Sequence, residues 1–463
     1  MNLLSLPYIG LIFGSSLFSW IFSKRTRPWW IAIVNLAFLY LLRAKTQDWA
    51  YILVLLSVIY LLSLLAEKTG KRKVFDGIGI VAALLGLCLY KYDLPSIGFF
   101  MPLGISFYTF KAVSYLADHL MAKVEFHANP VYLFDYLCFF PVFTAGPIHR
   151  CQPFFDALEK PFHFEYRDTM QGAVLAVFGA FEKFVISSTL GQYYVSFLDP
   201  SLSGWDTLFG IVLYGLFLYV DFDAYSNLAI GVSRLLGFKL DANFRCPYLS
   251  SSMNEFWRRW HISLGSWLRD YIYIPLGGNR KGFFRKQVNI LIVFLVSGIW
   301  HGNTWMFIIW GLGCGIVCVI DNLFSLLFQK LPKWKWLSMI GKLIGILIND
   351  CLVLVLWVFF FSTSVSSAVS VLQRIVPVFH GAPMSVSFAA AGLTAAQELW
   401  CLVLIAMVMV TDLLRYFFVM SEQFMHWNIV LRWAVYAIMI AIAIVFGNYG
   451  PGVHPSDFVY ERF

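Results

Sequence analysis

Long apolar runs recur along this chain from one end to the other, and they constrain its fold more than any other feature. A membrane-spanning helix needs roughly 20 mainly apolar residues. Some of the runs are short or interrupted by glycine and proline, so we expect about 11 of them to cross a bilayer and the rest to form re-entrant or short helices. The prediction is an all-α polytopic membrane protein. The runs lie near residues 7–23, 29–43, 49–66, 75–92, 98–117, 131–148, 170–190, 207–220, 287–300, 303–326, 343–362, 399–417 and 428–447.

The composition excludes several other classes of protein. Hydrophobic residues make up 60% of the 463 residues and charged residues 13%, whereas soluble globular chains have roughly 45–50% and 25%. These values exclude a disordered chain, a basic nucleic-acid-binding domain and an ordinary soluble enzyme. The eight cysteines include no CxxC pair, so neither a zinc site nor a disulfide framework is indicated.

The net charge of +8 comes from short clusters of Lys and Arg between the apolar runs. Such clusters mark cytoplasmic loops, so membrane topology explains them better than a nucleic-acid partner. The first run precedes its positive charges, which predicts a retained helix rather than a cleaved signal. We predict a transmembrane domain, 1–447, and an extracytoplasmic tail, 448–463. Residues 363–398 are also expected outside, as a lid or as a surface loop. The four clusters are Lys24–Arg27, Lys68–Lys73, Arg280–Lys286 and Lys330–Lys335.

A polar and aromatic segment, 254–280, interrupts the apolar pattern and is the first candidate site. We expect a helix over Glu255–Tyr271 that places its tryptophans and His261 on one face and arginines on the next. Such a helix could hold an adenine ring and phosphates by stacking and charge-assisted hydrogen bonds. It could equally be an interfacial anchor whose arginines reach the lipid headgroups. The candidate ligand-binding residues are Trp257, Arg258, Arg259, Trp260 and Arg269.

A second candidate is His301, in the sequence SGIWHG (297–302). The run before it begins next to a cytoplasmic basic cluster, and 14 helical residues carry the chain roughly 20 Å. His301 is therefore expected deep in the hydrocarbon zone, where Gly298 and Gly302 allow close backbone approach or a helix break. A neutral imidazole there could take a proton from an alcohol. The alternative is an ordinary packed histidine.

Motifs of several familiar enzyme classes are absent from the sequence. It contains no GxSxG nucleophile elbow, no Walker loop and no HExxH zinc motif. GLGCG at 311–315 lies in a predicted membrane helix, where small residues serve helix packing. The chain ends FVYERF, which composition alone would assign to an aromatic interfacial anchor.

Six longer motifs stand out along the chain: PLGISFYTF (102–110), YLAD (115–118), FFPVFTAGPI (139–148), DFDAYSNLAIG (221–231), FWRRWHISLGSWLRDYIYIPLGGNR (256–280) and SGIWHG (297–302). Together they resemble the membrane-bound O-acyltransferase (MBOAT) family, most closely its bacterial alginate O-acetyltransferase membrane-subunit branch. The resemblance covers roughly residues 100–320 and the tail. The YIYIPLGGNR ending of the fifth motif favours the polysaccharide-acetylating branch over the related teichoic-acid D-alanyl transfer protein.

The resemblance implies a ring of helices around a central tunnel, where a cytoplasmic and an extracytoplasmic funnel meet. It places the family's membrane-embedded histidine at His301 and a second functional histidine at His261. The FxYxxF motif of this branch, matched by Phe458, Tyr460 and Phe463, implies that the Tyr460 hydroxyl accepts the acyl group. One departure concerns a carboxylate, which relatives carry at the position of Asn227 and this chain carries at Asp223.

These observations predict a bacterial cell-membrane O-acetyltransferase that moves acetyl groups from cytoplasmic acetyl-CoA to an extracytoplasmic polysaccharide. Acetyl-CoA is expected as the donor substrate, with no bound cofactor or metal. The expected partners are an SGNH-type acetyltransferase, a polysaccharide acceptor reached indirectly, and the lipid bilayer. Two alternatives remain open: D-alanyl transfer to teichoic acid, and a non-catalytic transporter or scaffold.

Overall fold

A computed structural model describes most of the chain, and every regular element in the described ranges is a helix. The predicted all-α class is confirmed. The described residues divide into two compact units, one comprising 6–178 and 225–242 and the other 179–224 and 243–447. The described ranges are 6–19, 21–92, 101–160, 164–328, 335–418, 423–424 and 426–447.

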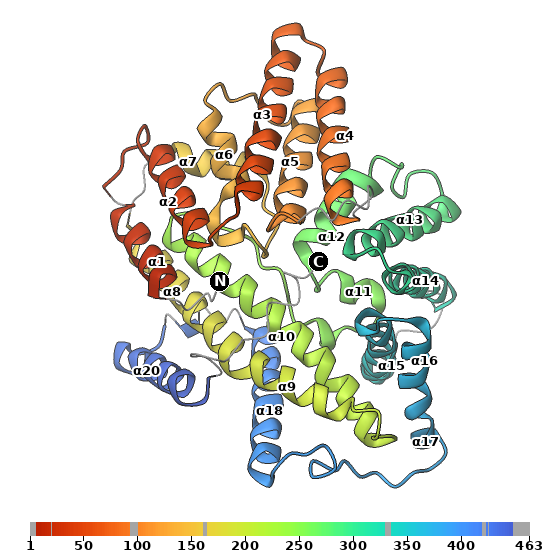
Figure 1. Ribbon diagram of the computed structural model, residues 1–463. Coiled ribbons are helices and arrows are strands. Elements are labelled where there is room, and N and C mark those ends of the chain that lie inside the picture. The colour runs from red at the N-terminus through yellow and green to blue at the C-terminus, as the bar shows by residue number, and fades with distance from the viewer. Residues whose placement is uncertain are drawn as a thin grey trace. The chain divides into compact units, whose positions relative to one another are not determined.

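The first unit is built on long helices joined by short connections. In this unit α3, α4 and α5 run side by side (Figure 1). Its helices are α1 (Leu6–Phe18), α2 (Arg27–Leu41), α3 (Thr46–Thr69), α4 (Arg72–Lys91), α5 (Ile105–Leu120), α6 (Pro130–Cys138), the 3₁₀ turn η1 (Phe140–Val142), α7 (Cys151–Glu159), most of α8 (Tyr166–Phe181) and the end of α10 (Trp205–Leu235).

Arg27 ties three parts of this unit together. Its guanidinium is buried and donates hydrogen bonds to the carbonyl oxygens of Ala157 (2.6 Å), Lys160 (2.8 Å) and Leu236 (2.9 Å). These carbonyls lie at or just beyond the C-terminal ends of α7 and α10, where helical hydrogen bonding stops. One arginine thus satisfies three backbone carbonyl groups at helix ends, where partners within the helix are lacking.

The second unit contains the predicted site residues. The antiparallel pair α13 and α14 approaches closely because both helices carry glycine at the contact. A Cβ atom on Gly298 would overlap the carbonyl oxygen of Phe307, and one on Gly311 would lie 2.5 Å from that of Phe294. The elements are η2 (Glu182–Ser187), α9 (Ser188–Phe197), the start of α10, η3 (Pro247–Leu249), α11 (Met253–Trp257), α12 (Ile262–Leu268), η4 (Arg269–Tyr273), α13 (Phe283–His301), α14 (Trp305–Phe328), α15 (Lys335–Phe361), α16 (Val365–Arg374), α17 (Val376–Phe379), α18 (Ala395–Phe417) and α20 (Ile429–Phe446).

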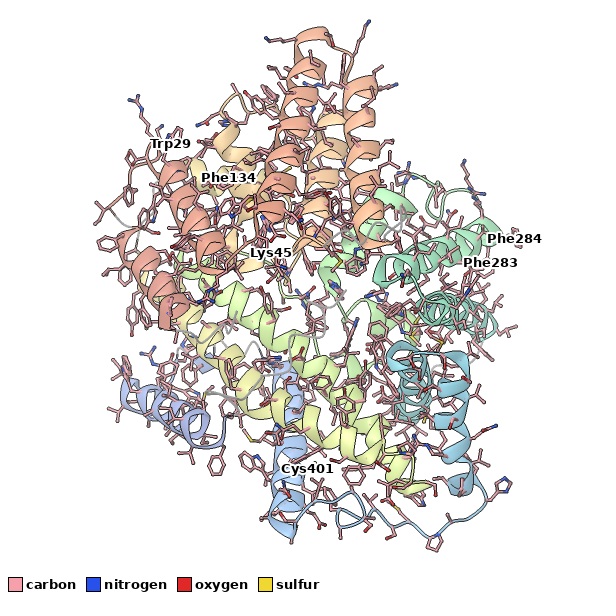
Figure 2. The ribbon with its side chains drawn as sticks, in the orientation of Figure 1. Trp29, Lys45, Phe134, Phe283, Phe284 and Cys401 are labelled. Atoms are coloured by element: carbon pink, nitrogen blue, oxygen red, sulfur yellow. The ribbon has the colours of Figure 1, made fainter. Side chains whose placement is uncertain are left out.

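Nine helices in the described ranges are long and apolar enough to cross a membrane, and three shorter apolar helices accompany them. Large apolar side chains such as Trp29 and Phe284 extend outward from α2 and α13 (Figure 2), with 57% and 82% of their surface exposed. Exposed apolar surface on this scale suits contact with lipid. The span within α10 is 78% buried, which makes it a core helix. The nine spans are Thr46–Thr69, Arg72–Lys91, Tyr166–Phe197, Trp205–Leu235, Phe283–His301, Trp305–Leu327, Met339–Phe361, Ala395–Phe417 and Ile429–Phe446.

Some predicted segments differ from the structure. The apolar run 131–148 is no span, because α6 ends at Cys138 and only a 3₁₀ turn follows at Pro141. Residues 363–398 are partly helical, since α16 and α17 lie within them. The tail 448–463 and most of the cluster Lys330–Lys335 lie outside the described residues, so the boundary at 447 and the orientation of the tail stay predictions.

Candidate active site

The chain folds back on itself around His261, and this turn shapes the site. The predicted continuous helix over Glu255–Tyr271 is wrong, because α11 ends at Trp257 and α12 starts at Ile262. His261 lies between them with φ 44° and ψ 53°, in the left-handed region. Such backbone conformations are costly for residues other than glycine and cluster at functional sites.

A neighbouring segment supplies the hydrogen bonds that the broken helix lacks. The backbone N–H of Ile262 donates to the carbonyl oxygen of Asn243 at 2.9 Å. The N–H of Arg245 donates to the carbonyl oxygen of Arg259, also at 2.9 Å. The break is therefore stabilised by contacts distant in sequence, which periodicity does not report.

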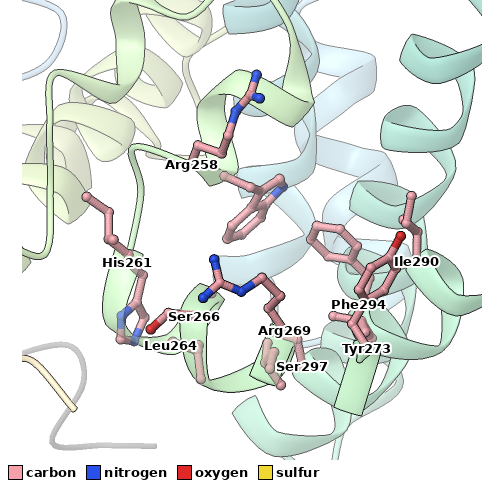
Figure 3. A pocket seen from close by; sticks show the side chains of 14 residues that line it. Arg258, His261, Leu264, Ser266, Arg269, Tyr273, Ile290, Phe294 and Ser297 are labelled. Carbon is pink, nitrogen blue, oxygen red and sulfur yellow. The ribbon is translucent and has the colours of Figure 1, made fainter. Parts of the chain in front are cut away.

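A pocket of about 320 Å³ opens beside this turn. It contains four of the predicted residues, His261, Trp257, Arg258 and Arg269, together with Ser297 of α13. Figure 3 shows the guanidinium of Arg269 extending among the lining side chains, whereas that of Arg258 points away from them. The lining residues are Trp257, Arg258, His261, Ile262, Leu264, Gly265, Ser266, Leu268, Arg269, Tyr273, Ile290, Val293, Phe294 and Ser297.

The two pocket arginines give the site its positive charge. Both side chains are exposed, and Arg269 also forms an ion pair with Asp270, whose Oδ1 lies 2.9 Å from Nη2 and accepts a hydrogen bond from Nε at 3.0 Å. A guanidinium offers five N–H donors in a fork that suits phosphate oxygens. With the indole of Trp257 beside them, these cations can bind a ligand that combines an aromatic ring with phosphates.

Arg259 and Trp260 are not among the pocket-lining residues. Arg259 forms an ion pair with Glu255 at 2.6 Å, and its guanidinium carbon lies 5.1 Å from the ring centroid of Tyr416. Trp260 is 1% exposed and packs against Trp357 with ring centroids 5.1 Å apart. In this structure both side chains stabilise the turn behind the pocket.

His301 is the last residue of α13 and is enclosed by aromatic rings. Its ring centroid lies 4.9 Å from that of Trp310 and 5.3 Å from that of Phe360. The side chain is 2% exposed and is not among the residues that line the pocket, although Ser297, about one helical turn earlier, is. His301 therefore lies behind the pocket's α13 wall.

Trp300 connects the two candidate histidines. Its ring centroid lies 6.4 Å from the ring of His261 and 4.6 Å from the ring of His301. The structure thus brings together two residues that are 40 positions apart in the sequence. On the other side of His261, the ring of Phe222 stands edge-to-face at 4.7 Å.

His261 is held neutral by its surroundings. It is 2% exposed, and desolvation lowers its pKa from 6.5 to about 3. An imidazole with such a low pKa carries one proton over the whole physiological range. It can accept a hydrogen bond or a proton at one nitrogen and donate at the other.

A buried group of charged residues was missed by the sequence analysis. Asp221 pairs with Lys183 at 2.5 Å, while Asp223 pairs with Arg415 at 2.5 Å, and Arg415 also reaches Glu182 at 3.4 Å. The carboxylate that departs from the family pattern therefore has a cation opposite it. Ionisable residues inside apolar helices are costly and usually functional, so the signal available was the position of Glu182, Lys183 and Arg415 within apolar runs and of the two aspartates directly after one.

The remaining predictions concern Tyr460 and a metal site. Tyr460 lies outside the described residues, so its acceptor role stays a prediction. Within the described ranges, no group of three or more His, Cys, Asp or Glu side chains is arranged to hold a metal ion.

Comparison with known proteins identifies the family. The sequence profile of the membrane-bound O-acyltransferase family matches residues 29–363, well over half of the chain. The chain belongs to this family. The resemblance predicted from the motifs, including the alginate branch, is confirmed by the individual relatives.

The names of the relatives refer to three different polymers, alginate, peptidoglycan and teichoic acid. The chain is 33% identical over 290 residues to the probable alginate O-acetylase AlgI of Pseudomonas putida, covering 58% of this chain and 59% of that protein. It is 32% identical over 316 residues to the peptidoglycan O-acetyltransferase of Helicobacter pylori, covering 62% and 59%. To the teichoic acid D-alanyltransferase of Bacillus subtilis it is 28% identical over 293 residues, covering 58% and 73%. The matches span 43% to 59% of the length of the alginate relatives.

Proposed function

We propose that this protein is a membrane O-acetyltransferase that moves acetyl groups from cytoplasmic acetyl-CoA across the bilayer for O-acetylation of an extracytoplasmic polysaccharide. The polymer would be of the alginate, cellulose or peptidoglycan type. One observation carries the proposal: a single pocket gathers His261, Trp257, Arg258 and Arg269, and the helix in its wall ends at His301.

The pocket suits the donor. A CoA thioester has an adenine ring and phosphates at one end and the thioester at the end of a flexible arm. Arg269 would bind the phosphates, Arg258 would join it once its exposed side chain turns toward the pocket (Figure 3), and Trp257 would contact the ring or the arm. Arg259 and Trp260, although behind the pocket, would keep this turn in place.

His301 does not line the pocket, so the thioester arm and the acceptor hydroxyl would have to pass the α13 wall for His301 to act as the general base. The acceptor hydroxyl oxygen attacks the thioester carbonyl carbon while the imidazole of His301 takes the hydroxyl proton. The C–S bond then breaks, and the imidazolium returns its proton to the departing sulfur. The products are an oxygen ester and free CoA thiol, and His301 is again a neutral imidazole. His261 would either orient the donor or stabilise the oxyanion that forms.

Acetyl groups would leave the enzyme on the opposite face of the membrane. The proposed first acceptor is the hydroxyl of Tyr460 in an extracytoplasmic tail, and an SGNH-type acetyltransferase would carry the group on to the polysaccharide. This order accounts for an enzyme whose donor is cytoplasmic and whose final acceptor is outside the cell membrane.

Acetyl transfer in reconstituted vesicles tests the proposal. We expect His301→Ala to lower transfer from acetyl-CoA by about 10²–10⁴-fold, the usual cost of losing a general base. His380→Ala is the matched control, because His380 is exposed in the turn after α17. Unchanged transfer in the His301 variant would remove the mechanism. If wild-type vesicles bind no CoA thioester, the result would instead support the alternative of a non-catalytic transporter or scaffold.

D-alanyl transfer to teichoic acid is a second candidate, favoured by the match to 73% of the Bacillus subtilis protein. This reaction requires a D-alanyl carrier protein as the donor. The same vesicles would then transfer D-alanine from that carrier and leave acetyl-CoA unchanged.

A further inference from the structure

The hydrogen bonds that the side chain of Asn243 accepts determine which way its amide group is oriented. Its Oδ1 lies 3.1 Å from the backbone nitrogen of Ser263 and 2.9 Å from the Oγ of the same residue. A backbone N–H can only donate, so the atom facing it must be the amide oxygen and not the amide nitrogen. Asn243 is 1% exposed, which leaves its amide little room to turn over.

This orientation fixes the proton on His261. The Nδ1 of His261 lies 3.3 Å from the same Oδ1 of Asn243. An amide oxygen cannot donate, so Nδ1 must carry the hydrogen of this contact. A neutral imidazole has one N–H, and Nε2 is then the nitrogen with the lone pair.

We infer that Asn243 is a positioning residue that holds His261 in the Nδ1–H tautomer, so that Nε2 meets the substrate as an acceptor. The inference about the substrate rests on the proposed function, whereas the tautomer rests on the contacts of Asn243 alone. Of the two roles open to His261, orienting the substrate agrees with this geometry, and donation to an oxyanion does not. The group that His261 binds must itself bear hydrogen, as an amide N–H of a CoA thioester or a hydroxyl does.

The surroundings of His261 support this assignment. The ring is clamped by Phe222 at 4.7 Å and faces Trp300 at 6.4 Å. The backbone of Asn243 also accepts the N–H of Ile262 at 2.9 Å, so one residue holds both the start of α12 and the histidine before it. The aromatic rings hold the imidazole in place, and the hydrogen bond from Nδ1 to Asn243 sets which nitrogen is protonated, as buried partners of a ring nitrogen normally do.

Solid-state NMR of ¹⁵N-histidine-labelled protein in lipid vesicles tests the tautomer, with His261→Asn used to assign the signal. We expect the Nδ1–H form of His261 near neutral pH in the wild type. An Nε2–H form, or an even mixture, would overturn the inference. This readout needs no acetyl transfer, so it stands even where the proposed function fails.

Two variants of Asn243 test its effect on the reaction. Asn243→Leu removes the acceptor and should lower transfer by about 10- to 100-fold, as loss of a supporting hydrogen bond to a functional histidine typically does. Asn243→Asp keeps the acceptor and the tautomer but adds a negative charge, which favours imidazolium, so the acid limb of the pH–rate profile should move to higher pH.

Asn35→Leu is the matched control. Asn35 is another buried asparagine, and its oxygen accepts the backbone N–H of Phe140 at 3.0 Å. Because Asn35→Leu also removes a buried amide, it shows what that loss alone does to folding and transfer. Wild-type rates and pH profiles in both Asn243 variants would contradict the positioning role.

Discussion

At the scale of single residues, the site combines exposed charged arginines with a buried neutral histidine. The exposed Arg258 and Arg269 supply positive charge at the pocket, while the buried His261 stays neutral. The ring of Trp300 lies against both His261 and His301. In the proposed mechanism the arginines attract the acyl donor, because a neutral histidine in this setting serves as a hydrogen-bond acceptor.

Arg269 is predicted to contribute to donor affinity and not to chemistry. Arg269→Gln should raise the KM for acetyl-CoA about 10- to 100-fold, because a hydrogen bond to a charged group contributes roughly 1.5–3 kcal/mol. The KM for acetyl-pantetheine, which lacks the adenosine phosphates, should change little. Steady-state kinetics would measure both values.

Arg280→Gln is the control for that experiment, since it removes an exposed basic residue that is not among the pocket-lining residues. An equal rise in KM for both donors, or the same rise in Arg280→Gln, would show that Arg269 does not bind the phosphates.

The pKa of His261 predicts how stability depends on pH. Its folded pKa, about 3, lies below the unfolded value near 6.5, so between these values the unfolded state binds the extra proton. The contribution of His261 to stability is complete above pH 6.5 and is lost as the pH falls toward 3. The melting temperature of the wild type should therefore fall more steeply between pH 7 and 5 than that of His261→Asn. Parallel curves would contradict the buried neutral state.

At the scale of elements, the pair α13–α14 carries His301 and positions it. The helices meet at Gly298 and Gly311, where a Cβ on either residue would press against a carbonyl oxygen of the other helix. His301 follows Gly298 on α13, and Trp310 precedes Gly311 on α14, so the histidine and its aromatic neighbour are fixed by the same contact.

Gly298→Ala is predicted to loosen this pair. The added methyl group should cost about 1–3 kcal/mol of stability, as overpacking does, and acetyl transfer should fall because His301 shifts. Thermal unfolding and transfer assays measure the two effects. Gly341→Ala on α15 is the control, since a Cβ there meets nothing within 4 Å. A Gly298 variant as stable and active as this control would show that close packing is not required.

The apolar runs predicted most of the long helices, whereas the helix predicted from periodicity over Glu255–Tyr271 failed because contacts distant in sequence decide the outcome there. Apolar runs gave the long spans because a lipid-facing helix needs little beyond length and composition. The break at His261 depends on hydrogen bonds from the segment around Asn243, and the pairing of Asp223 with Arg415 joins residues 192 positions apart. Neither of these contacts produces a recognisable pattern in the neighbouring sequence.

Only part of the candidate site could be predicted, because local sequence patterns do not report contacts between distant residues. Aromatic and basic residues close together in sequence identified Trp257, Arg258, His261 and Arg269, which do line one pocket. Arg259 and Trp260 belong to the same segment but do not line the pocket. The helix that would have placed them on one face with the other residues is broken between Trp257 and Ile262. The depth of His301 in an apolar run and the glycines beside it marked this residue before the family resemblance did, whereas the role of Asn243 required the structure.

At the scale of the whole molecule, the proposed reaction transfers an acetyl group between the two faces of a membrane. Nine helices of the described ranges can span a bilayer, and Lys286 lies 15 residues before His301, about 22 Å along α13. A basic cluster at one end of the helix and a histidine at the other suit a reaction whose donor and acceptor approach from different sides.

The most direct test is mass spectrometry of the C-terminal peptide from sealed vesicles that receive labelled acetyl-CoA only on the face of the basic clusters. The account predicts a labelled acetyl ester on Tyr460 in the wild type, removed by an esterase confined to the opposite face. The label should be absent in His301→Ala and in Tyr460→Phe. Active vesicles that never carry the ester on Tyr460, or that carry it only on the acetyl-CoA face, would contradict the account.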